Sequence, residues 1–222
     1  MTVYLFILGM PGSGKSSIAR FIQAYAEVKH WIARSHYNDY EILHSMFEND
    51  SACKQFRPAD GGGFDVIDLT AFDTALQKLE EIVKKDASPA HREEVVLIEF
   101  SRADYQRAFR QFSKAFLQNQ NTFFLYLDTG LDICKQRIKN RVTDPRYADD
   151  YPVSDYIFEK YYHQDDGELL PDMLAQEYQI EREQVKIIKN NGPLEVVAAE
   201  IRAFIDFIIS EVSKHLVKAG AS

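Results

Sequence analysis

Near the N-terminus, a glycine-rich segment lies between a strand-like run and a helix-like run. The apolar run from Val3 to Leu8 is typical of a buried strand, and a helical apolar period extends from about Ser16 to Glu27. Between them, the spacing from Gly9 to Ser16 is G-x-x-x-x-G-K-S, the P-loop pattern, in the strand-loop-helix context that its mechanism requires. The chain is therefore predicted to fold around a phosphate-binding loop.

The residue types of this loop suit a nucleotide phosphate. Glycines let successive backbone N–H groups turn inward, and the following helix directs its positive end at the same point. Lys15 adds a full positive charge, and the Ser16 hydroxyl suits a Mg²⁺ ion that bridges the β- and γ-phosphates. Ser17 lies either on the helix surface or against a phosphate. We expect ATP and Mg²⁺ as cofactors, with the nucleotide held by Gly9, Pro11, Gly12, Ser13, Gly14, Lys15, Ser16 and Ser17.

Apolar runs and helical periods alternate along the rest of the chain. Strand-like runs lie at 30–37 (weak), 95–100, 122–128 and 185–190. Helical periods start near Asp39 and cover 69–85, 105–117, 131–141 and 194–216. This alternation predicts an α/β fold, with a parallel sheet covered on both faces. Ligands of such sheets bind beyond the carboxyl ends of the strands, where Gly9, Asn38, Glu99 and Asp128 fall.

Residues 1–222 are expected to form a single domain with two long additions. One is a substrate-side insertion at about 40–94, and the other is a lid at about 131–172. Insertions of this length at the ligand end of a sheet are usually lids or substrate-binding flaps, and the alternative is surface elaboration.

Charge and cysteine content limit the partners. The formal net charge of −8 argues against binding to nucleic acid or to an anionic membrane. Cys53 and Cys134 give no disulfide framework, and no run reaches the roughly 18 apolar residues of a membrane span. We expect a cytoplasmic monomer or homodimer that acts on a small molecule.

The P-loop alone does not distinguish a switch GTPase, a motor or transport ATPase and a kinase. No asparagine is followed by lysine, so the N-K-x-D motif with which GTPases read their base is absent. The strand at 95–100 carries Glu99 alone, where motor ATPases usually have paired acids. Glu99 could reach Mg²⁺ through water, orient a substrate hydroxyl or lie in solvent.

Basic side chains follow the fourth strand. Arg137 and Arg141 are four residues apart and share a helix face, and Asp144-Pro145 ends the helix so that Arg146 can approach from a loop. Three guanidinium groups over the phosphates would neutralise charge on the transferred group and exclude water. The alternative is a solvated helix face.

Asp39 has two interpretations. Its carboxylate could act as a general base or orient the acceptor hydroxyl. Equally, it could be the N-cap or first-turn acid of the helix that follows. Of the six histidines, only His36 is expected near the strand ends.

The segments "GMPGSGKS", "VVLIEFS", "YLDTGLDICKQRIKNR" and "IIKNNGPLEVVAAEI" together resemble the P-loop kinase superfamily of nucleoside and nucleotide kinases. The plan is similar to that of adenylate kinases, and the lid helix is similar to that of deoxynucleoside kinases. The resemblance implies that Arg137, Arg141 and Arg146 contact phosphates, and that Asp39 faces the acceptor. It also implies that the adenine is bordered by Asn190, Asn191, Gly192 and Pro193. Deoxynucleoside kinases typically have E-R-S where this chain has Glu99-Phe100-Ser101, with an arginine at Arg102.

The prediction is a P-loop fold with three α/β/α layers, a five-stranded parallel sheet of order 2-3-1-4-5 and a helical lid. The predicted function is an ATP- and Mg²⁺-dependent small-molecule kinase that transfers the γ-phosphoryl group to a hydroxyl or phosphate acceptor, as nucleoside and nucleotide kinases do. Lys15, Asp39, Glu99, Arg137, Arg141 and Arg146 are the expected catalytic residues, and Ser16 and Glu99 the expected metal ligands. The alternative is a nucleotide-binding switch or regulatory ATPase or GTPase that acts on a protein partner.

Overall fold

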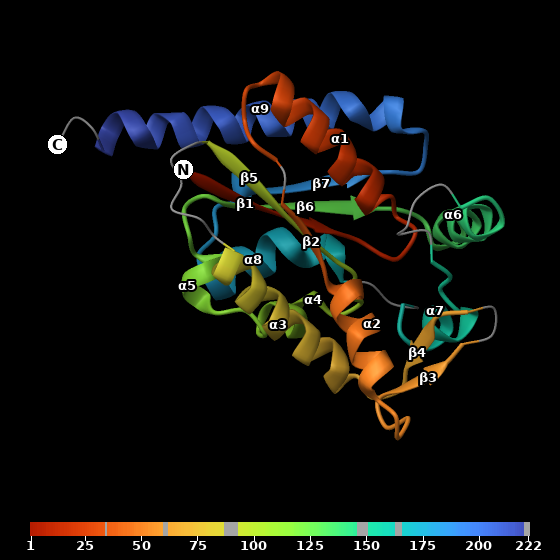
Figure 1. Ribbon diagram of the computed structural model, residues 1–222. Coiled ribbons are helices and arrows are strands. Elements are labelled where there is room, and N and C mark those ends of the chain that lie inside the picture. The colour runs from red at the N-terminus through yellow and green to blue at the C-terminus, as the bar shows by residue number, and fades with distance from the viewer. Residues whose placement is uncertain (34, 60–61, 87–92, 146–150, 163–165, 220–222) are drawn as a thin grey trace.

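A five-stranded parallel sheet forms the centre of the computed structural model (Figure 1). The structure describes residues 1–33, 35–59, 62–86, 93–145, 151–162 and 166–219, with side chains up to residue 214. From one edge of the sheet to the other, the strands are β2 (His36–Asn38), β5 (Glu94–Phe100), β1 (Thr2–Leu8), β6 (Thr122–Asp128) and β7 (Val185–Lys189). This is the predicted order 2-3-1-4-5, because β3 (Phe56–Pro58) and β4 (Phe64–Val66) pair only with each other in a separate antiparallel hairpin.

The second strand is shorter than the sequence predicts. The expected strand at 30–37 is reduced to three residues at the edge of the sheet, and Ile32 forms only an isolated bridge to Glu94. Trp31 and Ala33 of this segment are instead buried in the hydrophobic cluster on one face of the sheet. The burial of these two side chains accounts for the apolar signal that predicted a longer strand.

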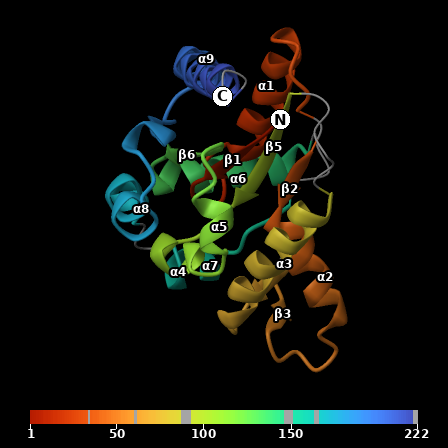
Figure 2. The same cartoon turned by 90° about the vertical axis from the view of Figure 1, so that its left-hand side faces the viewer.

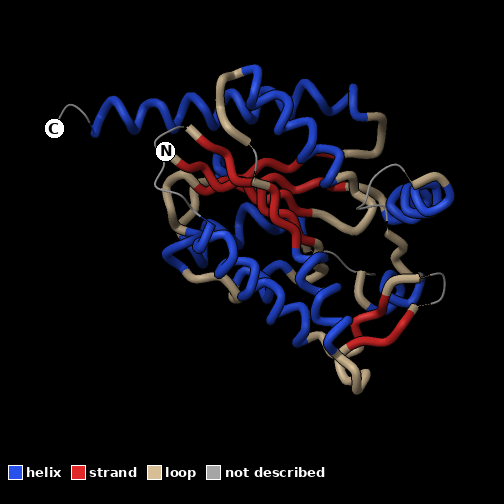
Figure 3. The backbone as a smooth tube through the Cα atoms, viewed as in Figure 1, coloured by secondary structure: helices blue, strands red, loops and turns tan. Residues whose placement is uncertain are grey.

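The alternation of side chains along β1 explains the two helical layers. Val3, Leu5 and Ile7 point to one face, where they pack with α1 (Lys15–Val28) and α9 (Leu194–Ala219). Phe6 and Leu8 point to the other face. Figures 1 and 2 show α1 and α9 together on one side of the sheet. The layer that packs on Phe6 and Leu8 comprises α3 (Thr70–Asp86), α4 (Tyr105–Phe109), α5 (Lys114–Leu117) and α8 (Leu170–Tyr178). The tube drawing shows the strands between these layers (Figure 3).

Phe6 is the centre of an aromatic cluster in the second layer. Its ring stacks on that of Phe124 at 5.1 Å between centroids, and edge contacts join it to Phe109 and Phe112. Rings in these arrangements gain about 0.5–1.5 kcal/mol per pair beyond the area that they bury. The sheet is thereby held in position for the loops at its carboxyl edge.

The predicted helix over 105–117 is broken into α4 and α5. Ser113 lies at the break, where its N–H donates to the carboxylate of Glu80 (2.7 Å) and its hydroxyl accepts from the N–H of Phe116 as the N-cap of α5. Both short helices bury phenylalanines on the same face, so the apolar period runs through the break and does not reveal it.

The two predicted additions meet beyond the carboxyl edge of the sheet. The first contains α2 (Asp39–Asn49), the β3–β4 hairpin and α3, and the second contains α6 (Leu131–Thr143), α7 (Asp155–Lys160) and the 3₁₀ turn η1 (Gly167–Leu169). Figure 1 shows α7 beside the hairpin, where the two elements are in contact. Asp65 of β4 joins them, because it pairs with Arg57 of β3 and accepts a hydrogen bond from Ser154.

The chain ends in its longest helix. A short 3₁₀ turn, η2 (Arg182–Gln184), leads into β7, and α9 then runs back along the α1 face of the sheet (Figure 1). None of the helices in the described part of the chain combines the length and the apolar character that crossing a membrane requires.

Candidate functional site

The strand register brings the predicted site residues to one edge of the sheet. Asn38 lies opposite Glu99 in the β2–β5 pair, and Ile7 lies opposite Glu99 in the β1–β5 pair. The P-loop therefore leaves β1 beside the carboxyl ends of β5 and β2. Asp39, which follows β2 directly, starts from the same edge.

The P-loop is packed tightly against neighbouring segments. Gly12 and Gly14 have φ angles of +80° and +98°, which side chains rarely permit. A Cβ atom at Gly12 would lie 2.4 Å from the carbonyl oxygen of Cys134, and one at Gly14 would lie 2.8 Å from Nδ2 of Asn190. Any larger residue would push the loop away from α6 and from the end of β7.

The P-loop and the start of α1 bring backbone N–H groups and a lysine to one end of a cavity. The first N–H groups of any helix lack intrahelical acceptors, and here they belong to the segment Lys15–Ser17, which lines a cavity. The ammonium group of Lys15 donates to the carbonyl oxygen of Met10 (3.0 Å). Burial lowers the pKa of Lys15, and the nearby carboxylates of Glu99 and Asp39 oppose this shift. This loop fits a nucleotide phosphate in shape and charge.

Glu99 joins the P-loop to β2. Its Oε1 accepts from the Ser16 hydroxyl (3.1 Å), and its Oε2 lies 2.9 Å from Nε2 of His36. The carboxylate is buried, so the interpretation of Glu99 as a solvated strand-end acid is wrong. Ser16 and Glu99 offer the hard oxygen donors that Mg²⁺ prefers, and they lie within hydrogen-bond distance of each other. His36, the one histidine expected near the strand ends, contacts Glu99.

Asp39 is a buried acid with a buried cationic partner. The N-cap of α2 is Asn38, whose side chain accepts from the N–H of Glu41 (3.0 Å), so Asp39 is not the N-cap. It is an acid of the first turn of α2, which was the other form of that interpretation. Asp39 is 7% exposed and pairs with Arg102, which is 2% exposed. Burial raises the pKa of Asp39, and the charge of Arg102 opposes the rise. Arg102 also donates to the carbonyl oxygen of Phe72 (3.0 Å).

The two described arginines of the predicted lid have different contacts. Arg137 donates to the carbonyl oxygens of Ser13 (3.3 Å) and Gly192 (2.9 Å). Arg141 donates to the carbonyl oxygen of Tyr151 (2.9 Å), and its guanidinium lies 5.2 Å from the centre of the Tyr151 ring. Both arginines line the cavity, whereas Arg146 lies outside the described residues.

The loop predicted to border the adenine, residues 190–193, contacts the P-loop. Asn190 donates to the carbonyl oxygen of Ser13 (2.7 Å), and Oδ1 of Asn191 accepts from the N–H of Gly130 (2.9 Å). Among the described residues, Asn190, Asn191, Gly192 and Pro193 are not part of the cavity lining. Arg137 connects them to the cavity through Gly192. Their contact with a base stays a prediction.

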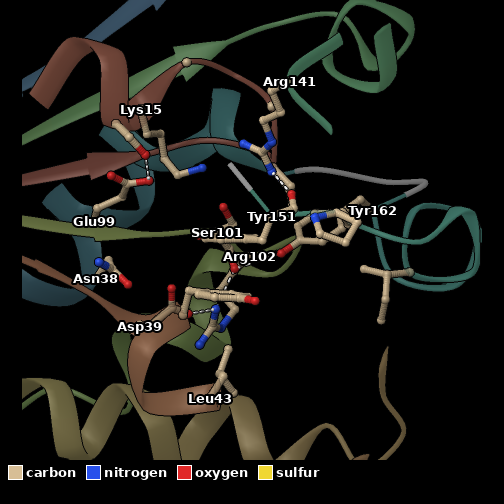
Figure 4. Close-up of a pocket in the computed structure, with 18 of the residues that line it drawn as sticks. Lys15, Asn38, Asp39, Leu43, Glu99, Ser101, Arg102, Arg141, Tyr151 and Tyr162 are labelled. Atoms are coloured by element: carbon tan, nitrogen blue, oxygen red, sulfur yellow. Dashed lines mark hydrogen bonds and ion pairs between the residues drawn. The ribbon is translucent and has the colours of Figure 1, made fainter. Parts of the chain in front are cut away.

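One cavity of about 300 Å³ is lined both by P-loop residues and by Asp39. Figure 4 shows Lys15 and Arg141 on one side of it and Asp39 on the other. The rest of the cavity wall was mostly given no role by the sequence analysis. It is formed by Tyr40, Leu43, Phe64, Val66, Phe72, Arg102, Tyr151, Pro152, Val153, Ile157 and Tyr162. The only sequence signal for these residues was the density of tyrosines at 37–40 and 151–162.

Comparison with solved structures shows the fold. Kti12 of Chaetomium thermophilum, in complex with ADP-AlF3, is similar to this chain with a TM-score of 0.58 and 14% identity, over 93% of this chain and 98% of that one. The APS kinase of Mycobacterium tuberculosis, in complex with AMPPNP and APS, has a TM-score of 0.53 and 14% identity, over 92% and 98% of the two chains. No family model and no curated protein sequence matches the chain. The chain has the α/β fold of P-loop kinases, as its sequence predicts.

Proposed function

We propose that this chain is an ATP- and Mg²⁺-dependent phosphotransferase that transfers the γ-phosphoryl group to a small-molecule acceptor. One observation carries the proposal: a single cavity has the P-loop residues Lys15 and Ser16 on one side and the buried carboxylate of Asp39 on the other. A protein that only binds nucleotide needs the first side. A transferase needs a polar group on the second side, where a second substrate can lie.

The nucleotide side would be held by the P-loop and α1. Lys15 and the first-turn N–H groups of α1 would bind phosphate oxygens, and Ser16 with Glu99 would hold the magnesium ion. Bound there, Mg²⁺ supplies positive charge to the phosphate oxygens. The hydrogen bond from Ser16 and the contact with His36 position both oxygens of Glu99.

The acceptor side would be organised by Asp39. Its Oδ2 is used by Arg102, which leaves Oδ1 for the hydroxyl group of an acceptor. The positive charge of Arg102 beside the carboxyl favours its ionised form, and an ionised carboxylate can accept a proton from the attacking hydroxyl. Arg141 lies on the same side of the cavity as Lys15 and would neutralise charge on the transferred group.

The test is acceptor-dependent formation of ADP by the purified protein. The variant Lys15→Ala should retain less than about a tenth of the wild-type rate, because a lysine on the phosphates supplies several kcal/mol of charge stabilisation. Lys29→Ala is the matched control, since Lys29 pairs with Asp206 on the surface (2.9 Å), and it should act like the wild type.

Two results would count against the proposal. Activity of Lys15→Ala equal to that of Lys29→Ala would show that the P-loop lysine has no role in transfer. Nucleotide hydrolysis that no acceptor accelerates, and that a protein partner does accelerate, would favour the switch or regulatory ATPase instead.

A further inference from the structure

The described lining of the cavity includes the tyrosines Tyr40, Tyr151 and Tyr162, whose hydroxyl groups have no role in the proposed transfer. The hydroxyl of Tyr162 donates to the carbonyl oxygen of Ser101 (3.0 Å), so its proton is already used. No described residue forms a hydrogen bond with the hydroxyl of Tyr40 or of Tyr151. Each of these two phenols therefore has a proton that a ligand in the cavity can accept in a hydrogen bond.

The ring of Tyr151 is held beside both halves of the proposed site. It lies face to face with the ring of Tyr40, which directly follows Asp39 in the chain, at 3.3 Å between centres and 4° between planes. The guanidinium of Arg141 lies 5.2 Å from the centre of the Tyr151 ring and donates to the Tyr151 carbonyl oxygen (2.9 Å; Figure 4). Among the described residues, Arg141 has no acidic partner, and its buried Nε has no hydrogen-bond partner. Tyr151 therefore lies next to a cation whose charge an anionic group can neutralise.

The charges that act on Tyr151 indicate where its hydroxyl lies. Burial raises the pKa of Tyr151 well above its ordinary value. The negative charges of Glu99 and Asp39 raise this pKa further, and the positive charge of Arg141 opposes them. The same three groups also act on the pKa of Lys15. The phenol of Tyr151 and the ammonium group of Lys15 thus lie in the same part of the cavity.

The pKa values also distinguish Tyr151 from Tyr40. Burial raises the pKa of Tyr40 as well, but Arg141 is the only charged group that acts on it, so the Tyr40 hydroxyl lies farther from the two carboxylates. Because the pKa of Tyr151 is raised, its phenol keeps its proton at neutral pH and is a hydrogen-bond donor. This donor lies among the groups that the proposed function assigns to the phosphates, the metal and the acceptor.

We propose that Tyr151 is a further catalytic residue, whose O–H donates a hydrogen bond to the γ-phosphoryl group during its transfer. The inference rests on the proposed transferase function and adds a residue to its site. The acceptor oxygen bonds to the γ-phosphorus, the bond from that phosphorus to the bridging oxygen of ADP breaks, and the acceptor proton passes to Asp39. Tyr151 keeps its own proton throughout. A donor that is in place before the reaction stabilises the charge on the transferred oxygens.

The test uses ADP with aluminium fluoride, because planar AlF3 resembles the phosphoryl group in the transition state. Calorimetry measures the affinity for ADP in the presence of Mg²⁺, with and without aluminium fluoride. The wild type should bind ADP at least about tenfold more tightly when aluminium fluoride is present, since a site built for transfer binds such a mimic better than the ground state. The measurement needs no acceptor.

The variant Tyr151→Phe removes the hydroxyl and keeps the ring that stacks on Tyr40. It should weaken the binding of ADP with aluminium fluoride by about tenfold or more and change the affinity for ADP alone by less than about twofold. The unchanged affinity for ADP shows that the P-loop is folded. Tyr156→Phe is the matched control, because the Tyr156 ring lies against Arg57 (4.1 Å) and is not part of the described cavity lining. It should bind both ligands as the wild type does.

Three results would overturn the inference. The first is equal affinity of Tyr151→Phe and Tyr156→Phe for ADP with aluminium fluoride. The second is an equally large loss for ADP alone, which would make Tyr151 a structural residue of the nucleotide site. The third is a wild type that gains no affinity from aluminium fluoride, because a site for the transferred group would then be missing.

The variant Lys15→Ala distinguishes this inference from the proposed function. If Lys15→Ala loses the gain in affinity from aluminium fluoride and Tyr151→Phe keeps it, only the role of Tyr151 is wrong. If Lys15→Ala keeps the gain, the P-loop lysine does not act on the transferred group and the proposed function itself fails.

Discussion

At the scale of single residues, Asp39 shows how the burial of a carboxyl group is opposed by a buried cationic partner. Burial raises its pKa above the ordinary value, because the ionised form loses its contact with water. The charges of Arg102 and Lys15 oppose that rise, and Glu99 adds to it. The ionisation of the proposed acceptor-orienting group therefore depends on Arg102, which sequence analysis treated only as a displaced arginine.

This balance predicts how kcat/KM for the acceptor depends on pH. Its fall on the acid side should lie at a higher pH than an ordinary aspartate would give. Because the pKa of Asp39 is raised, the carboxyl takes up its proton at a higher pH than an ordinary aspartate does. The rate should fall as the pH drops through that raised pKa. In Arg102→Lys this fall should move to higher pH, since a point charge pairs less well than the guanidinium fork. Arg107→Lys, which changes the surface pair with Asp73, is the control and should leave the fall unchanged.

At the scale of elements, α6 carries two arginines whose contacts lie in different places. Arg137 braces the P-loop against the loop after β7, through the carbonyl oxygens of Ser13 and Gly192. Arg141, one turn later, contacts Tyr151 and lies near enough to Lys15 to lower the pKa of that lysine. One helix thus connects the P-loop and the loop after β7 to Tyr151 on the wall of the cavity.

The two arginines should give different kinetic defects. Arg141→Ala is expected to lower kcat about a hundredfold with little change in ATP affinity, because charge develops on the transferred group only during reaction. Arg137→Ala is expected to weaken ATP binding more than it lowers kcat, since it positions the loops. Steady-state kinetics with ATP and the acceptor varied measure both. If the two variants change neither constant and shift stability by less than about 0.5 kcal/mol, α6 has a solvated face with no catalytic role.

Elements with a continuous apolar pattern could be placed from the sequence. β1, β5 and β6 are buried on both faces of the sheet, so each appears as an uninterrupted apolar run. The β3–β4 hairpin could not be found, because its strands have three residues each and one contains Pro58.

The pairing of Asp39 with Arg102 and the stacking of Tyr40 on Tyr151 were also missed. These contacts join residues 63 and 111 positions apart, and no local pattern records them.

At the scale of the whole molecule, the carbonyl group of Ser13 connects three segments to the P-loop. It accepts from Thr129 after β6 (3.3 Å), from Arg137 of α6 (3.3 Å) and from Asn190 after β7 (2.7 Å). The proposed phosphate site is thus built from segments that come together only when the sheet has formed. A ligand of that site should bind the folded chain and not the unfolded one.

Nucleotide should therefore stabilise the protein against heat. At a ligand concentration about a hundredfold above Kd, the free energy of unfolding should rise by about 2.7 kcal/mol. For a chain of this size, that corresponds to an increase of roughly 5–10 °C in Tm. Differential scanning calorimetry with ATP and Mg²⁺ measures the shift, and adenosine, which lacks phosphates, should give a much smaller one. An equal shift with adenosine would mean that the P-loop contributes little to binding.

The position of Trp31 decides what fluorescence can report in this protein. It is the single tryptophan of the chain, and it is buried with α1 and α9 on the face of the sheet opposite to the Phe6 cluster. Its emission follows the separation of α1 and α9 from the sheet. Near-ultraviolet circular dichroism from tyrosine and phenylalanine follows both layers, because these residues pack on both faces of the sheet. Denaturation curves from the two signals overlay if both layers unfold in one cooperative step, and they separate if one layer unfolds first.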